Sequence, residues 1–67
     1  MNIFINGEES VVEDNISVKN LLEHLGVTQK VMAVAVNSNI VRKDGWELHN
    51  LSENDKVELL QFTGGGA

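Results

Sequence analysis

Alternating and closely spaced apolar residues divide most of the chain into short elements. Two β-type runs at the N-terminal end flank Asn6-Gly7, the dipeptide most typical of a two-residue hairpin turn. Later apolar runs are separated by the turn-forming segments 37–39 and 53–55. The pattern predicts strands over residues 1–5, 8–13, 31–36, 40–42 and 56–62. The run 31–36 is rich in β-branched residues, which predicts a central strand buried on at least part of both faces.

One amphipathic helix is predicted between the second and third strands. Four apolar residues recur at the spacing of a single buried helical face: Val18, Leu21, Leu22 and Leu25. Ser17 stands where an N-cap is expected, and Gly26 stands where a glycine closes a helix in the left-handed conformation. The N-cap residue, the apolar face and the C-terminal glycine all indicate one helix of about two turns, whose four apolar residues are predicted to be buried.

The resulting β-β-α-β-β-β order predicts an α+β fold, a mixed sheet of four or five strands with one main helix on one face. The segment 43–52 is predicted to be irregular, with a short 3₁₀ turn. No linker or repeat interrupts the pattern, so we expect one domain over residues 1–62 and a flexible, glycine-rich C-terminal tail over residues 63–67.

Alternation along the strands leaves the second face of this sheet without a cover. Phe4, Leu60 and Phe62 alternate along their strands with other apolar residues. If those other residues pack under the helix, then Phe4, Leu60 and Phe62 lie on the opposite face of the sheet, together with Glu58. An exposed apolar patch on a small domain usually marks a protein interface. The alternative is that Trp46, from the irregular segment, folds over the patch as a second small core. We favour the interface.

Composition narrows the classes of partner and compartment. Ten acidic residues against five basic ones give a net charge of −5, which disfavours nucleic acid and suits a basic patch on a protein partner, although it also serves simple solubility. The absence of cysteine excludes a thiolate metal site and fits a reducing cytoplasm. No apolar run approaches the roughly 20 residues that span a bilayer. The sequence predicts a cytoplasmic protein without nucleic-acid or membrane partners.

No catalytic or metal-binding pattern is legible. The two histidines, His24 and His49, have no ligand-spaced companions, and surface positions are expected for both. Paired carboxylates, a nucleophile with its base and a phosphate-binding loop are likewise not found. We therefore expect a chain that is not itself an enzyme and that binds no metal or cofactor.

The segment Gly64-Gly65-Gly66-Ala67 follows the last strand directly. Glycines contribute no side-chain chemistry, and without Cβ atoms they form a thin and conformationally free segment. Such a tail suits insertion into a narrow active site on another protein, with a terminal carboxylate as its reactive group. The sequence thus favours a carrier or substrate that a partner enzyme acts upon.

Several segments together resemble the ThiS family, the small ubiquitin-like β-grasp sulfur carriers of thiamin thiazole synthesis, which are related to MoaD. The acidic turn, final strand and terminal glycines are the most specific part of this resemblance, which covers essentially the whole chain. The segments that carry it are Ser17–Leu22 with Leu25-Gly26, Val34–Asn37 with Ile40-Val41, and Asn54–Glu58 leading into Phe62–Gly66.

The resemblance implies a reaction at the tail. In similar carriers a ThiF-like adenylyltransferase uses ATP and magnesium to adenylate the terminal glycine carboxylate. Sulfur from a donor protein then replaces AMP, and the resulting thiocarboxylate supplies a ThiG-like thiazole synthase. Matching the tail to the family places the reacting acyl carbon on Gly66, with Gly64 and Gly65 in the activating enzyme's cleft. The expected partner-binding residues are Phe4, Glu58, Leu60 and Phe62.

Two departures from the family pattern bear on this expectation. Ala67 follows the glycine at which family members normally finish, and we expect its removal, or its addition during cloning, rather than a carrier that is never activated. Asn54 stands where the family more often has glycine, and asparagine tolerates the left-handed conformation better than other residues. Two alternatives stay open: a carrier of this fold for molybdopterin or another pathway, and a non-covalent ubiquitin-like interaction module.

Overall fold

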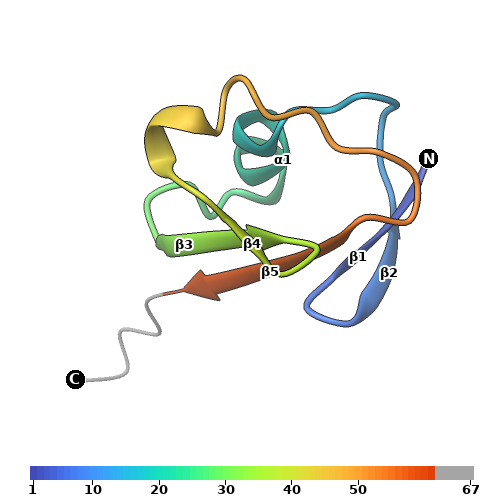
Figure 1. The fold of residues 1–67 in the computed structure, drawn as a ribbon, viewed down its shortest axis with the longest axis horizontal. Coiled ribbons are helices and arrows are strands. Elements are labelled where there is room, and N and C mark those ends of the chain that lie inside the picture. The colour runs from blue at the N-terminus through green and yellow to red at the C-terminus, as the bar shows by residue number, and fades with distance from the viewer. Residues whose placement is uncertain (62–67) are drawn as a thin grey trace.

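The computed structural model describes residues 1–61 and has the predicted order of elements (Figure 1). The strands are β1 (Asn2–Ile5), β2 (Glu8–Val11), β3 (Val31–Val36), β4 (Asn39–Val41) and β5 (Lys56–Gln61), and the helices are α1 (Val18–Leu25) and the 3₁₀ helix η1 (Lys43–Gly45). The end of the predicted last strand, Phe62, and the predicted tail 63–67 lie outside the described residues. Within residues 1–61 no helix is long and apolar enough to cross a bilayer.

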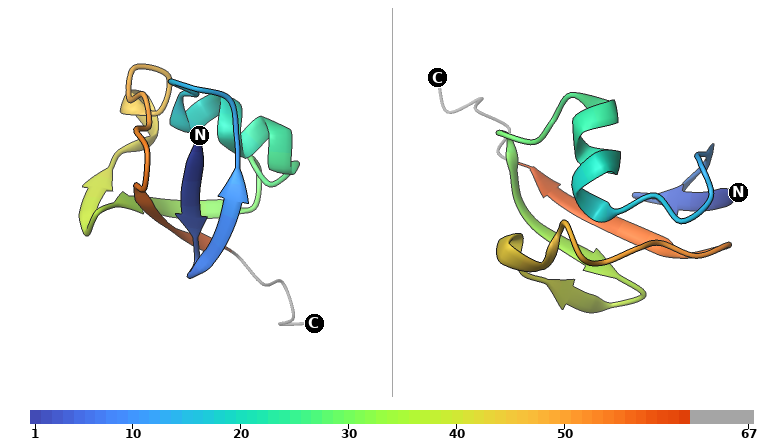
Figure 2. Two further views of the ribbon diagram at one scale, coloured as in Figure 1. Left: turned by 90° about the vertical axis from the view of Figure 1, so that its right-hand side faces the viewer. Right: turned by 90° about the horizontal axis from the view of Figure 1, so that it is seen from above.

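All five strands join one mixed sheet in the order β2-β1-β5-β3-β4. The strands β1 and β5 are parallel neighbours, and the other pairs are antiparallel. This arrangement, with α1 packed across one face, is the β-grasp fold that the sequence predicted (Figure 2). The strand β3 lies next to the centre: Val34 and Val36 on its helix side are buried, and Ala33 and Ala35 on the other side are half-buried.

The tight turns follow from asparagine and glycine in left-handed conformations. Asn6 and Gly7 have φ values of 50° and 88°, which joins β1 to β2 as the Asn-Gly pair predicted. Asn37 and Ser38 (φ 51° and 72°) make a second two-residue hairpin, one residue shorter than predicted, so β4 begins at Asn39. Asn54 adopts φ 68°, as expected for an asparagine in place of glycine.

The helix begins and ends at the predicted residues. The Ser17 side chain accepts a hydrogen bond from the Asn20 amide at 3.1 Å, and Gly26 closes the helix at φ 72°. Val18, Leu21 and Leu22 are buried, but the prediction for Leu25 is wrong, since it is 41% exposed. Leu25 shares their face but lies in the final turn, where the neighbouring chain at Val27 is itself only partly buried.

A single core fills the space between α1 and the sheet. Its members come from every layer of the fold: Ile3, Val18, Leu21, Leu22, Val34, Val36, Trp46, Leu51, Val57 and Leu59. The segment that contains η1 runs beside α1, on the same side of the sheet (Figure 2). Trp46 is 4% exposed, its indole Nε1 donates to the Val41 carbonyl at 3.0 Å, and its own carbonyl accepts from the Lys19 amide. Trp46 thus completes the core on the helix side.

Candidate functional site

The sheet face away from α1 is the candidate docking surface. On β5, Val57 and Leu59 point into the core, so the alternating residues Lys56, Glu58 and Leu60 point away from it. The register places the neighbours of these residues on the same side: Phe4 opposite Lys56, Ala35 opposite Glu58, and Ala33 opposite Leu60. We call this surface the open face and define it as Phe4, Ala33, Ala35, Ile40, Lys56, Glu58 and Leu60.

The open face combines accessible apolar side chains with charged ones. Leu60 is 60% exposed, Phe4 is half-buried and Glu58 is exposed. A shallow hollow of about 290 Å³ lies beside Phe4 and Glu58, and Gly7, Lys56 and Val57 complete its lining. Trp46 does not cover this face, because it packs in the core on the opposite side. The predicted uncovered patch therefore exists for Phe4 and Leu60, and its predicted third member, Phe62, lies outside the described residues.

Ile40 belongs to the open face and was not predicted from the sequence. It is 68% exposed and pairs with Ala35, directly across β3 from Glu58. Its position follows from the two-residue turn Asn37-Ser38, which sets the register of β4 against β3. Apolar alternation alone could not locate it, because β4 is only three residues long.

Of the acidic residues near the last strand, Glu58 is the one that faces outward. The Asp55 carboxylate accepts hydrogen bonds from the Asn37 side-chain amide at 2.9 Å and from the Ser52 backbone amide at 2.8 Å. These bonds tie the β3–β4 turn to the start of β5. Asp55 is thus a structural residue, and the acidic contribution of β5 to a docking surface rests on Glu58.

The residues predicted to react lie beyond the described chain. Gly64, Gly65 and Gly66 follow β5 directly in sequence, and Gln61, the last residue of β5, precedes Gly66 by five positions (66 − 61). The strand that leads to the predicted acyl carbon therefore also carries Glu58 and Leu60 of the open face. The candidate docking surface thus includes residues of the strand that precedes the predicted reacting residues in the sequence.

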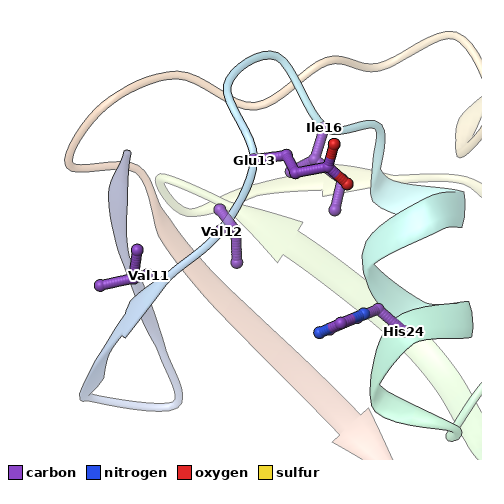
Figure 3. A pocket seen from close by; sticks show the side chains of 5 residues that line it. All are labelled: Val11, Val12, Glu13, Ile16 and His24. Carbon is purple, nitrogen blue, oxygen red and sulfur yellow. The ribbon is translucent and has the colours of Figure 1, made fainter.

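The histidines form no second site. His24 is exposed and borders an apolar hollow of about 340 Å³ between the end of β2 and α1, together with Val11, Val12, Glu13 and Ile16 (Figure 3). His49 is half-buried in the segment after η1, where its carbonyl accepts from the Val18 amide. Among residues 1–61 no three histidine, cysteine or carboxylate side chains gather as metal ligands would.

Comparison with known proteins agrees with this geometry. The ThiS family model matches residues 2–66, from the first strand through the last of the three glycines. The sulfur carrier protein ThiS of Escherichia coli is 32% identical over 66 residues, which cover 98% of this chain and 100% of that protein. A thiazole synthase of Paramagnetospirillum magneticum is 37% identical over the whole of this chain, which spans only 21% of that protein's length.

A solved structure gives the same result in three dimensions. The crystal structure of the thiamine biosynthesis protein ThiS from Geobacter metallireducens superposes with a TM-score of 0.83 at 31% identity, covering 98% of this chain and 100% of that one. Sequence and fold agree over nearly the full length of both chains. The chain belongs to the ThiS family.

Proposed function

We propose that this chain is a sulfur carrier of thiamin biosynthesis, modified at the carboxyl group of Gly66. The observation that carries the proposal is the family match over residues 2–66, which includes the glycines themselves and not only the fold. The name of the Escherichia coli relative, a sulfur carrier protein, supports the same role. In this role the chain is a protein cosubstrate, and partner enzymes perform the catalysis.

The proposed chemistry begins with activation of a poor electrophile. Once a peptidase has hydrolysed the Gly66–Ala67 peptide bond, a carboxylate oxygen of Gly66 attacks the α-phosphorus of ATP in a ThiF-like adenylyltransferase, with magnesium, and pyrophosphate leaves. The mixed anhydride makes AMP a good leaving group, so hydrosulfide supplied by a donor protein can attack the acyl carbon and AMP leaves. The product is a thiocarboxylate, whose soft and ionised sulfur is nucleophilic without a cysteine in the chain.

The open face supplies the proposed docking surface for the adenylyltransferase. Leu60, Ile40 and Phe4 offer apolar area, and Glu58 offers a charge for a basic residue of the partner. The four residues from Thr63 to Gly66 span about 13–14 Å when fully extended. This reach lets Gly66 enter a catalytic cleft while the open face rests on the surface beside it.

The proposed acceptor of the sulfur is a ThiG-like thiazole synthase. The thiazole synthase relative contains, within its own chain, a stretch similar to this whole protein. A second thiazole synthase, from Magnetococcus marinus, shows the same relation over 20% of its length. Joining two activities in one polypeptide raises their effective concentration, which suits a carrier and the enzyme it supplies. This relation favours the thiamin pathway over the other sulfur-transfer pathways that use the same fold.

Removing the tail separates a carrier from a non-covalent interaction module. A chain that ends at Phe62 retains all described elements, including the open face, but lacks the three glycines and the carboxyl group of Gly66. In a reconstituted thiazole synthesis assay we expect it to support no product, and to inhibit the chain ending at Gly66 by occupying the adenylyltransferase. A truncated chain that supports as much product formation as the chain ending at Gly66 would refute the proposal.

A further inference from the structure

The last strand loses one of its neighbours before it reaches the tail. On the β1 side, β5 is paired only at Lys56 and Val57, opposite Phe4 and Ile5. It then continues past the β1–β2 hairpin (Figure 1), and within residues 1–61 no strand pairs with it on that side beyond Val57. On its other side β5 stays paired with β3 as far as Gln61. The strand segment that leads to the tail is therefore held from one side only.

Asn6 takes the place of the missing strand. Its backbone amide donates to the Val57 carbonyl at 2.9 Å, and its side-chain Oδ1 accepts from the Leu59 amide at 2.8 Å. The carbonyl of Val57 and the amide of Leu59 are successive groups on the same edge of β5. Asn6 thus adds two hydrogen bonds along this edge of β5, beyond the last residue of β1.

The turn conformation makes this contact possible. Asn6 is the first residue of the Asn6-Gly7 turn and has φ 50°, a conformation that asparagine, aspartate and glycine adopt most readily. Among these three residues, only asparagine and aspartate carry a side-chain oxygen that can accept from Leu59. Two requirements therefore restrict residue 6: it must adopt the left-handed turn conformation, and its side chain must accept a hydrogen bond from β5.

We propose that Asn6 is a positioning residue for the carrier reaction, which fixes the C-terminal end of β5 so that the tail leaves the domain from a defined point. This inference rests on the proposed function. Without the bond, the end of β5 is held only by its pairing with β3 and by the burial of Leu59. Where residues 59–61 open locally, the chain between the last paired residue and Gly66 lengthens from about five to about eight residues. The concentration of a tethered end falls roughly as the −3/2 power of tether length, so insertion of Gly66 into the adenylyltransferase becomes less frequent.

Two substitutions separate the bond from the turn. Asn6→Gly keeps the left-handed turn and removes the acceptor, whereas Asn6→Asp keeps both. For Asn6→Gly we expect amide hydrogen exchange at Leu59 to be about five-fold faster. With chains ending at Gly66, a ThiF-like adenylyltransferase, ATP and magnesium, we expect kcat for adenylation to fall by up to about two-fold, with KM unchanged because the open face is unchanged. Asn6→Asp should restore both values.

Three outcomes would overturn the assignment. Adenylation of Asn6→Gly at the wild-type kcat would show that the hydrogen bond between Asn6 and Leu59 does not affect how often Gly66 reaches the active site. A rise in KM at constant kcat would make Asn6 a part of the docking surface instead. Failure of Asn6→Asp to recover kcat would mean that the amide acts by some other route than accepting from Leu59. A chain ending at Gly66, with Asn6 unchanged, that the enzyme cannot adenylate would refute the proposed function itself, whereas the three outcomes above leave that function standing.

Discussion

Replacing Leu60 by alanine tests the docking surface with little disturbance of the fold. Leu60 is 60% exposed and lies on the open face opposite Ala33, outside the core cluster. Its β5 neighbours Val57 and Leu59 carry the packing under the helix. Truncating Leu60 therefore removes apolar area that is accessible to a partner, and leaves the buried side of the strand unchanged.

The size of the effect follows from the area that remains exposed. Full burial of a leucine side chain contributes about 1.5–3 kcal/mol. If docking covers the exposed 60% of Leu60, the contribution is about 1–2 kcal/mol, which corresponds to a roughly 5- to 30-fold weaker Kd. We expect Leu60→Ala to bind a ThiF-like adenylyltransferase more weakly by this factor.

Leu25→Ala is the matched control for this substitution. Leu25 is 41% exposed and lies in the last turn of α1, on the opposite side of the sheet from the open face. Calorimetric titration of each chain with the adenylyltransferase gives Kd, and thermal unfolding confirms that both variants fold. Equal Kd values for wild type and Leu60→Ala, or an equal loss for Leu25→Ala, would refute the assignment of the open face as the docking surface.

Three further substitutions test charge, packing and backbone. Glu58→Lys should slow association with the adenylyltransferase by a factor that shrinks as salt is added, and stopped-flow rates that do not change would count against an acidic contact. Leu21→Ala removes a fully buried side chain and should lower the free energy of unfolding by about 2–5 kcal/mol in urea titrations; a loss below about 1 kcal/mol would contradict the packing of α1. Gly26→Ala should cost about 1–2 kcal/mol because of the backbone at φ 72°, although no atom lies within 4 Å of the added Cβ. Gly26→Asn should cost less, and an equal loss for both would contradict a conformational origin.

The elements that sequence reasoning located best are those fixed by local chemistry. The Asn6-Gly7 turn, the Ser17 cap and the Gly26 stop each depend on a few consecutive residues, and the structure confirms all three. Alternation along β5 also sorted Val57 and Leu59 to the core and Leu60 to the open face. These patterns need no knowledge of which strands pair.

Features that depend on strand pairing or on neighbouring segments could not be predicted from these local patterns. The place of Ile40 on the open face depends on the β3–β4 register, and the exposure of Leu25 depends on what packs against the last turn of α1. The bond from Leu59 to Asn6 joins residues 53 positions apart. It becomes visible only once β1 and β5 are known to be parallel neighbours, because no local pattern relates the two ends of the chain.

The proposed division of labour separates recognition from reaction along a single strand. Glu58 and Leu60 lie on the open face, Leu59 is anchored in the core and to Asn6, and Gly66 carries the acyl group. Binding energy from the open face can then hold the carrier while the three glycines, which have no side chains, enter the active sites of successive partners. Variants on the face should act on affinity, and changes to the tail should abolish the reaction.

Intact-mass spectrometry tests the central claim most directly. The chain ending at Gly66 and the chain that retains Ala67 are each incubated with a ThiF-like adenylyltransferase, ATP, magnesium and a sulfur donor. We predict that the chain ending at Gly66 gains the mass increment of oxygen replaced by sulfur, located on Gly66 by fragmentation, and that the chain retaining Ala67 gains it only after losing that residue. A chain ending at Gly66 that never acquires AMP or sulfur under these conditions would contradict the account.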